Sequence, residues 1–379
     1  MVNSSTMTLI VIVMALYFVG MIAISWMGRK YGKNFDDFIS AGRNCTTLMI
    51  IGSAVGSHIG NGYVVGGAAS GAAVGLSGAW YGIGCALSYL AVALVLNHRV
   101  YKCGYISLPE ILNARYGEKM TSVIFSVTTA LSYIANIAAQ LMAGKALFEA
   151  LGFNGTLGVW VIAVVVMAYS CISGLWGACA TSVVQVAIII VSLLATFFIV
   201  LGRGALGLVT EAVANGLAPA SYFDMGVDGF AAILITIVPI SLAALCEQCT
   251  VQRITSAKSE KTSFRALILS VIIMIPCALM PAFIGMYGYV LFGDTTNSVF
   301  FKVALDVLPG FFAALLIAAV VAAIMSTIDT MFVAFSTIIM HNIYRGMINP
   351  DASEGTLKKG DFACHLFLTV GAAVIALQF

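Results

Sequence analysis

Three ionisable side chains fall in stretches that are otherwise apolar: His58, Glu247 and Asp329. An ionisable group at membrane depth is energetically expensive, so each of the three is a candidate for function. We expect no Lys or Arg at the same depth, which leaves a metal ion or a positively charged solute from outside the chain as their companion. The alternative is that each group is neutral and is satisfied by neighbouring hydroxyl and carbonyl groups.

The segment around His58 predicts a break in a helix. Residues 56–62 (GSHIGNG) combine three glycines with three polar side chains, and this composition has poor helix propensity. Unwound backbone at membrane depth occurs where it lines a cavity or is buried in protein, and its free carbonyl oxygens can then bind a cation. Alternatively, the spacing of Gly56 and Gly60 is a packing motif between helices.

A second break is expected at residues 245–249 (LCEQC), where Glu247 stands beside Gln248. A carboxylate and an amide at such a break are typical of a pair that binds a solute. Cys246 and Cys249 form a CxxC, whose metal or redox interpretation needs partner ligands that the sequence does not offer. Broken helices at matching positions in two halves of a chain indicate an inverted-repeat transporter, with ion and solute bound near the middle of the membrane.

Hydroxyl groups cluster in residues 322–330 (AAIMSTIDT). Helical spacing puts Ser326, Asp329 and Thr330 on one face, with Thr327 at its margin. Hydroxyl and carbonyl oxygens suit a hard monovalent cation such as Na⁺. The structural alternative is that these hydroxyls bond back to the preceding helical turn.

The elements that must position these residues are membrane-spanning helices. Of the 379 residues, 61% are apolar and 9% are charged, whereas soluble proteins carry about 25% charged residues. This balance excludes a nucleic-acid-binding protein, a disordered chain and a secreted disulfide scaffold. Stretches of about 20 apolar residues predict an all-α polytopic membrane protein with ten spans, near 7–27, 46–70, 76–97, 120–148, 158–174, 181–202, 229–248, 266–292, 309–340 and 362–379.

The distribution of basic residues predicts the topology. Fifteen of the eighteen Lys and Arg fall in the connections 28–45, 98–119, 249–265 and 341–361. Cytoplasmic loops collect positive charge, so these connections are expected inside and the N-terminus outside. We also expect a short amphipathic helix within 104–117 on the cytoplasmic face. A long outer loop at 203–228 is expected to divide the two halves.

Short motifs follow one another along nearly the whole chain. In order, they are Ser40 to Arg43 (SAGR), Ser107 to Glu110 (SLPE) with Arg115 to Gly117 (RYG), Ser173 to Trp176 (SGLW), Gln252-Arg253 with Ala257-Lys258, Ala322 to Thr330, and His341 to Tyr344 (HNIY). Together they resemble the sodium:solute symporter family. The resemblance implies alternating access driven by Na⁺ and the LeuT-type fold of two inverted five-helix repeats behind one extra helix. In this chain the leading helix is expected in 1–28, the first repeat in 29–202, the outer loop in 203–228, and a second repeat lacking its last helix in 229–379.

The resemblance also implies the site residues. The family's shared sodium site corresponds to the backbone carbonyls of Gly56, Ile59 and Ala323 and the hydroxyls of Ser326 and Thr327. The solute is expected nearby, against His58, Asn61, Glu247 and Gln248, with Ser132, Tyr133 and Asn136 as further candidates. Asp329 is a candidate for coupling.

Two departures from the family pattern refine these expectations. Family members with a second sodium carry a Thr-Asp pair after the Gly-Leu-Trp segment, where this chain has Thr181-Ser182, so we expect one Na⁺ per cycle. The segment around Asn61 looks closest to the choline-transporting branch, in which aromatic side chains should cage the quaternary ammonium. His58 and Glu247 stand where those aromatic groups would be needed, so choline is not the expected solute.

We therefore expect a symporter, not an enzyme, that couples inward movement of Na⁺ to uptake of a small polar organic solute and uses no organic cofactor. Glu247 favours a solute with an amine, an amino acid or a small organic cation; a carboxylate, vitamin or sugar is the alternative. A channel would instead show pore-lining polar residues on several helices. An intramembrane enzyme would need its ionisable groups within reach of one another. The expected location is a bacterial plasma membrane.

Overall fold

The computed structural model describes residues 4–32, 34–117 and 119–378, and this part of the chain is helical. Within it, seven helical segments are long and apolar enough to span a membrane, or eight when the bent pair α11 (Gly229–Leu245) and α12 (Gln248–Thr255) counts as one span. The protein is therefore an all-helical polytopic membrane protein, as the composition predicts.

The other helices and helical turns follow the chain in this order: α1 (Ser4–Gly28), η1 (Arg29–Tyr31), α2 (Phe35–Ser40), η2 (Ala41–Arg43), α3 (Thr47–His58), α4 (Asn61–Val74), η3 (Gly75–Ala79), α5 (Trp80–Ala91), η4 (Val92–Leu96), α6 (Asn97–Cys103), α7 (Leu108–Tyr116), α8 (Lys119–Ala150), α9 (Gly155–Gly202), α10 (Ala205–Ala214), α13 (Glu260–Phe292), α14 (Ser298–Lys302), η5 (Val303–Val307), α15 (Gly310–Ser336), η6 (Thr337–Ile348) and α16 (Glu354–Gln378).

The observed number of spanning segments is lower than the ten expected from hydropathy. The difference lies in two segments of 43 and 48 residues, Asn61–Cys103 and Gly155–Gly202. Each is about twice as long as a bilayer requires. Gly75 (φ 76°) interrupts the first segment, and Gly174 (φ 56°, ψ −145°) interrupts the second. The sequence places boundaries between predicted spans close to these two glycines.

The two breaks predicted inside spans are confirmed. Helix α3 ends at His58, and α4 begins at Asn61 after Ile59 (φ −78°, ψ 58°) and the extended residue Gly60. Helices α11 and α12 are separated by Cys246 and Glu247, and the chain bends by 57° between them. Glycine and polar residues lie at the break between α3 and α4, as their poor helix propensity predicts.

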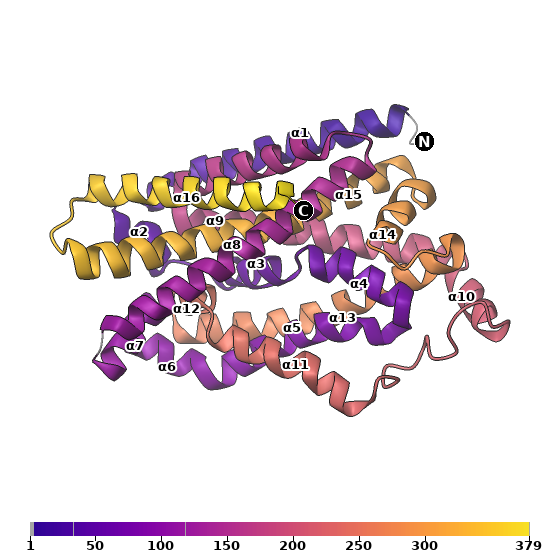
Figure 1. The fold of residues 1–379 in the computed structure, drawn as a ribbon, viewed down its shortest axis with the longest axis horizontal. Helices are drawn as coiled ribbons and strands as arrows, with labels where there is room; N and C mark the ends of the chain where they lie inside the picture. Colours follow the sequence, from indigo (N-terminus) through magenta and orange to yellow (C-terminus); the bar gives the residue numbers. More distant parts are fainter. Residues whose placement is uncertain (1–3, 33, 118, 379) are drawn as a thin grey trace.

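Helix α15 forms the centre of the molecule, and every residue from Leu316 to Ser336 is buried. It packs against α9, α1, α8 and α3. Figure 1 shows α1, α9, α15 and α16 on one side of the molecule and α5, α6 and α11 on the other, with α3 and α4 between them. The first broken helix therefore lies against the buried hydroxyl-bearing helix.

Helices α4 and α13 approach each other closely at two glycines. A Cβ atom at Gly71 of α4 would overlap the backbone of Ala282 in α13, and one at Gly285 of α13 would overlap the backbone of Ala68 in α4. This reciprocal contact is the kind of close backbone approach that small residues permit between membrane helices.

Two of the connections between the spanning segments contain short helices. The amphipathic helix expected within 104–117 is present as α7, whose N-terminus has a capping box formed by Ser107 and Glu110. The connection expected at 203–228 contains a short helix, α10, that the sequence does not predict. The rest packs against the body of the protein, because Tyr222 accepts a backbone bond from Leu76 at 2.8 Å and Trp80 Nε1 donates to the carbonyl of Met225 at 2.6 Å.

Candidate ion and solute site

Four of the five oxygen atoms predicted to bind Na⁺, those of Gly56, Ala323, Ser326 and Thr327, meet where α15 crosses the end of α3. Ser326 Oγ donates to the carbonyl of Gly56 at 2.7 Å and to that of Ala323 at 3.2 Å. Thr327 Oγ1 donates to the carbonyl of Ala323 at 3.0 Å and to that of Ser57 at 3.3 Å. Both hydroxyls therefore bond back within their own helix, as the structural alternative predicts, and also reach across to α3.

The remaining predicted ligand, the carbonyl of Ile59, belongs to the break itself. The amide of Ile59 closes α3 by donating to the carbonyl of Val55 at 2.8 Å, so the Ile59 carbonyl lies beyond the helix end. At the next residue, a Cβ on Gly60 would lie 2.9 Å from Thr327 Oγ1. Glycine at this position thus lets the unwound backbone approach the α15 hydroxyl.

A cavity of about 680 Å³ opens beside this oxygen cluster. Six of the seven predicted solute-binding residues line it: His58, Asn61, Ser132, Tyr133, Asn136 and Glu247. Thr327 lines the cavity as well, so the same residue belongs to both the oxygen cluster and the cavity wall. The structure brings the two predicted sites together around this residue.

The seventh residue, Gln248, does not line the cavity. Its side chain is buried, and its Oε1 accepts a hydrogen bond from the amide of Leu108 at 2.8 Å. The first residue of α12 therefore holds the N-terminus of α7 rather than facing a solute.

The expectation that no cation accompanies the buried ionisable groups is wrong. The side chain of Arg253 in α12 is 1% exposed, and its Nη1 lies 3.9 Å from Glu247 Oε2. The guanidinium also donates to Ser53 Oγ at 3.1 Å and Ser57 Oγ at 2.7 Å, and both acceptors belong to α3. A buried arginine therefore joins the two broken helices behind the cavity and partly balances the charge of Glu247.

His58 belongs to the same polar network. Its Nδ1 lies 2.7 Å from the hydroxyl of Tyr89, which also accepts a hydrogen bond from Arg253 Nη1 at 3.1 Å. Tyr89 was not among the predicted residues, nor was Gln140, whose Oε1 accepts from the amide of Asn61 at 3.3 Å. An isolated glutamine in the apolar stretch 120–148 is a signal that could have identified Gln140.

Asp329 lies on a different side of α15 from the cavity. Its Oδ2 accepts a hydrogen bond from Thr181 Oγ1 of α9 at 3.2 Å, and its Oδ1 has no hydrogen-bond partner among the described residues. Nearby on α9, Gln185 donates to the hydroxyl of Tyr17 in α1 at 2.9 Å. A carboxylate therefore lies beside Thr181 as it would in a Thr-Asp pair, but it comes from Asp329 of α15 and not from the residue after Thr181.

A second polar cluster joins α2, α7 and η6 away from the cavity. His341 Nε2 lies 2.7 Å from Glu110 Oε1, and Arg345 Nη1 donates to Asp36 Oδ1 at 2.7 Å. Burial opposes ionisation of Glu110, but the hydrogen bond from His341, supported by two backbone N–H groups, holds the pKa of its carboxyl below the ordinary value.

Comparison with known proteins is consistent with this geometry. Residues 38–379 match the sodium:solute symporter family. The chain is 24% identical to the sodium/proline symporter of Escherichia coli, over 92% of this chain and 73% of that protein. It is also 24% identical to the high-affinity proline transporter of Bacillus subtilis, over 94% of this chain and 78% of that protein.

A solved structure has the same fold. A Na⁺-coupled sialic acid symporter superimposes with a TM-score of 0.86 at 17% identity, over 98% of this chain and 82% of that one. At this identity the likeness shows the fold alone, and the family match carries the assignment. The chain belongs to the sodium:solute symporter family, has the LeuT-type fold, and is a Na⁺-coupled solute symporter rather than an enzyme.

Proposed function

We propose that inward movement of Na⁺, bound at the oxygen cluster, drives uptake of a small zwitterionic solute held in the adjoining cavity. The observation that carries this proposal is the position of Thr327, which lines the cavity and whose hydroxyl belongs to the oxygen cluster. A Na⁺ ion there would replace the hydrogen bonds that Ser326 and Thr327 make to carbonyl groups, and would take the carbonyls of Gly56, Ile59 and Ala323 with the two hydroxyls as oxygen ligands. Ion binding would then fix the break that forms one wall of the cavity.

The charge in the cavity wall favours an amino acid over an organic cation. Glu247 can accept an ammonium group, but Arg253 at 3.9 Å already offsets part of its charge. A solute with a single positive charge would leave that charge poorly balanced. Helix α4 begins at the cavity, and the positive end of its dipole suits a carboxylate. An ammonium at Glu247 and a carboxylate near Asn61 together describe a zwitterion.

The remaining groups around the cavity offer neutral hydrogen bonds. Ser132, Tyr133 and Asn136 of α8 face the same space, and Tyr133 is held by a contact of 3.3 Å with Cys249. Two relatives are named for proline, so proline is the first amino acid to test.

Alternating access in this proposal uses ten spans, with each of the two interrupted segments, Asn61–Cys103 and Gly155–Gly202, counted as two spans. Residues 1–28 supply the leading helix, 29–202 the first five-helix repeat, and 229–379 the inverted second repeat, with the N-terminus outside. We propose a bacterial plasma membrane as the host. The cluster of Glu110, His341, Asp36 and Arg345 would then close the cytoplasmic end.

Asp329 is proposed to contribute to coupling from behind α15. Its carboxylate contacts Thr181 of α9 and lies three residues from Ser326 on the same helix. A change in its interactions can therefore alter the position of the α15 hydroxyls without contact to the solute. One Na⁺ per cycle remains the proposed stoichiometry.

The test is uptake of labelled L-proline and other amino acids into proteoliposomes with an inward Na⁺ gradient. An equal K⁺ gradient is the control for ion specificity, and choline and glucose are the competing solutes. We expect saturable, Na⁺-dependent accumulation of an amino acid. Accumulation of choline or glucose alone would contradict the proposed solute class, and flux that never saturates would favour a channel.

A further inference from the structure

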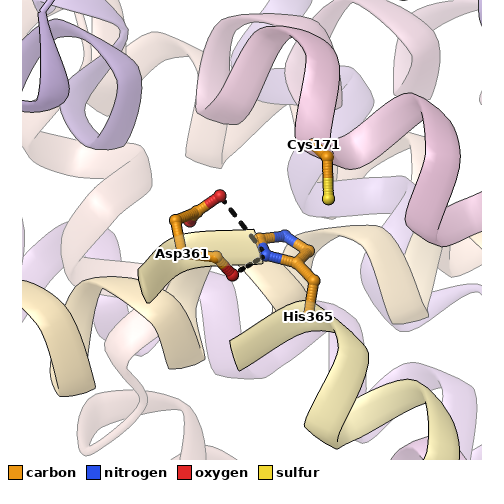
Figure 2. A group of neighbouring side chains, drawn as sticks. All are labelled: Cys171, Asp361 and His365. Carbon is orange, nitrogen blue, oxygen red and sulfur yellow. Dashed lines mark hydrogen bonds and ion pairs between the residues drawn. The ribbon is translucent and has the colours of Figure 1, made fainter. Parts of the chain in front are cut away.

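Away from the cavity, three potential metal ligands come together between α9 and α16. Cys171 lies on α9, three residues before the interruption at Gly174, while Asp361 and His365 lie one turn apart on α16. One ligand atom from each of the three side chains lies within 4.8 Å of the other two. Figure 2 shows the sulfur of Cys171 directed at the imidazole of His365.

The hydrogen bonds of His365 leave its other ring nitrogen free to bind a metal. Its Nδ1 lies 2.8 Å from the carbonyl of Asp361 and 3.5 Å from Asp361 Oδ2. Because a carbonyl can only accept, Nδ1 carries the proton, and Nε2 of the neutral ring keeps a lone pair. In Figure 2, Nε2 is on the ring edge that faces Cys171. Metal-bound histidines are held in this way, with the second nitrogen donating to a carbonyl or carboxylate.

Two of the candidate ligand atoms are buried and unpartnered. His365 Nε2 and Asp361 Oδ1 have no hydrogen-bond partner among the described residues, and their side chains are 0% and 5% exposed. Buried polar atoms normally find a partner, so two in one cluster call for an explanation. A shared metal ion would satisfy both atoms at once.

We propose that Cys171, Asp361 and His365 bind a divalent transition metal ion of the Zn²⁺ class. Thiolate, imidazole and carboxylate are all ligands of zinc, and three protein ligands leave a fourth position for water. The charges support this choice, because one thiolate and one carboxylate balance a divalent cation. A neutral complex avoids the cost of an isolated charge among apolar helices.

The geometry requires a small adjustment. Bond lengths of about 2.0–2.3 Å around a tetrahedral Zn²⁺ separate neighbouring ligand atoms by about 3.3–3.8 Å. In the structure one ligand atom of each side chain lies within 4.8 Å of the other two, so side-chain rotation must bring Nε2, the sulfur and a carboxylate oxygen closer together. Cys171 is only partly buried, which leaves a path by which the ion can enter. Binding would tie α9 to α16 beside the interruption at Gly174.

The experiment titrates the purified full chain in detergent with Zn²⁺, and separately with Co²⁺ as a spectroscopic probe. We expect one metal ion per chain, a thiolate-to-cobalt charge-transfer band, and a metal-dependent rise in melting temperature. Cys171→Ser and Asp361→Asn should each weaken binding by at least about tenfold, since even outer-sphere changes at metal sites cost that much. Cys171→Ser should also abolish the charge-transfer band.

Cys277→Ser is the matched control, because it removes a buried thiol on α13 that is not part of the cluster. Exposed thiols such as Cys246 remain in every variant, so adventitious binding is common to all of them. A charge-transfer band as strong in Cys171→Ser as in Cys277→Ser, or wild-type binding no tighter than that of both ligand variants, would overturn the proposal. Melting temperatures without metal identify any variant that has failed to fold, and Asp361→Asn supplies an independent second test.

Discussion

Replacing Ser326 by alanine should raise the Na⁺ concentration that the protein needs, because it removes one of five proposed oxygen ligands. The hydroxyl is 0% exposed and lies 2.7 Å from the carbonyl of Gly56, so its contacts belong to the oxygen cluster. Ser326 does not line the solute cavity, so its direct effect is confined to the ion.

The magnitude follows from the kind of contact that is lost. A hydrogen bond or dipole interaction with a charged group contributes about 1.5–3 kcal/mol. At 1.4 kcal/mol for each factor of ten, we expect the half-saturating Na⁺ concentration to rise about 10- to 150-fold. The half-saturating concentration of the solute at saturating Na⁺ should change much less.

The assay measures melting temperature and solute uptake while NaCl replaces KCl at constant ionic strength, since an ion that binds only the folded state stabilises it. The control is Ser270→Ala, which removes a buried hydroxyl that donates to Ala266 in its own helix, α13. An unchanged Na⁺ dependence in Ser326→Ala, with unfolding in KCl no different from Ser270→Ala, would refute the assignment of this hydroxyl to the ion site.

Three further changes test neighbouring parts of the argument. Gly60→Ala puts a methyl group 2.9 Å from Thr327 Oγ1 and should raise the Na⁺ requirement in the same titration. Gly62→Ala is the control, because its Cβ would lie 3.8 Å from its nearest neighbour, the hydroxyl of Tyr81, and should leave the Na⁺ requirement unchanged. Equal effects of the two substitutions would contradict the steric reasoning. Glu247→Gln should raise the half-saturating amino-acid concentration in the uptake assay by about 10- to 150-fold through loss of a charged hydrogen bond. Transport equal to that of the parent would rule out an ammonium contact. Because the pKa of Glu110 is lowered in the folded protein, its ionised carboxyl stabilises the fold at pH values above the ordinary glutamate pKa of about 4.3. This contribution is lost as the pH falls through the lowered pKa. Glu110→Gln should therefore lose melting temperature at neutral pH and show a weaker acid dependence than the parent; identical curves would argue against the contact with His341.

Local sequence features predict the two breaks and the cluster of hydroxyls well. Glycine and polar residues around His58 have poor helix propensity wherever they occur, so the break needs no knowledge of tertiary structure. Helical spacing groups Ser326 with Asp329 and Thr330 and puts Thr327 at the margin of that face, and in the structure the hydroxyls of Ser326 and Thr327 both reach α3. These features depend on residues close together in the chain.

The position of Arg253 depends on tertiary structure and could not be predicted in the same way. Its basic side chain, after the predicted span 229–248, suggests a cytoplasmic loop. In the structure the chain turns by 57° after Leu245 and forms another helix, α12, that carries Arg253 back into the protein. The hydroxyls of Ser53 and Ser57 on α3 and of Tyr89 on α5, together with the carboxylate of Glu247, explain how a charge is accepted there.

The sequence also does not predict which neighbouring helix the side chain of Asp329 contacts. Helical spacing groups it with Ser326, and on that basis it could face the cavity. A helix that is buried all round presents polar groups to several neighbours, however, and the sequence does not say which neighbour each group meets. In the structure the carboxylate of Asp329 accepts a hydrogen bond from Thr181 of α9.

The reciprocal glycine contact between α4 and α13 determines where the first broken helix can move. With Gly71 set against Ala282 and Gly285 against Ala68, sliding either helix along the other would bring the Cβ atom of a neighbouring residue against the partner's backbone. A Cβ atom cannot rotate aside and a close-packed interior transmits strain, so the two helices would move together. Any tilt of α4 relative to α3 would then fall at Ile59 and Gly60, the two residues between the helices, which would serve as the hinge. The same two residues border the oxygen cluster, so an ion bound there would act directly on the pivot.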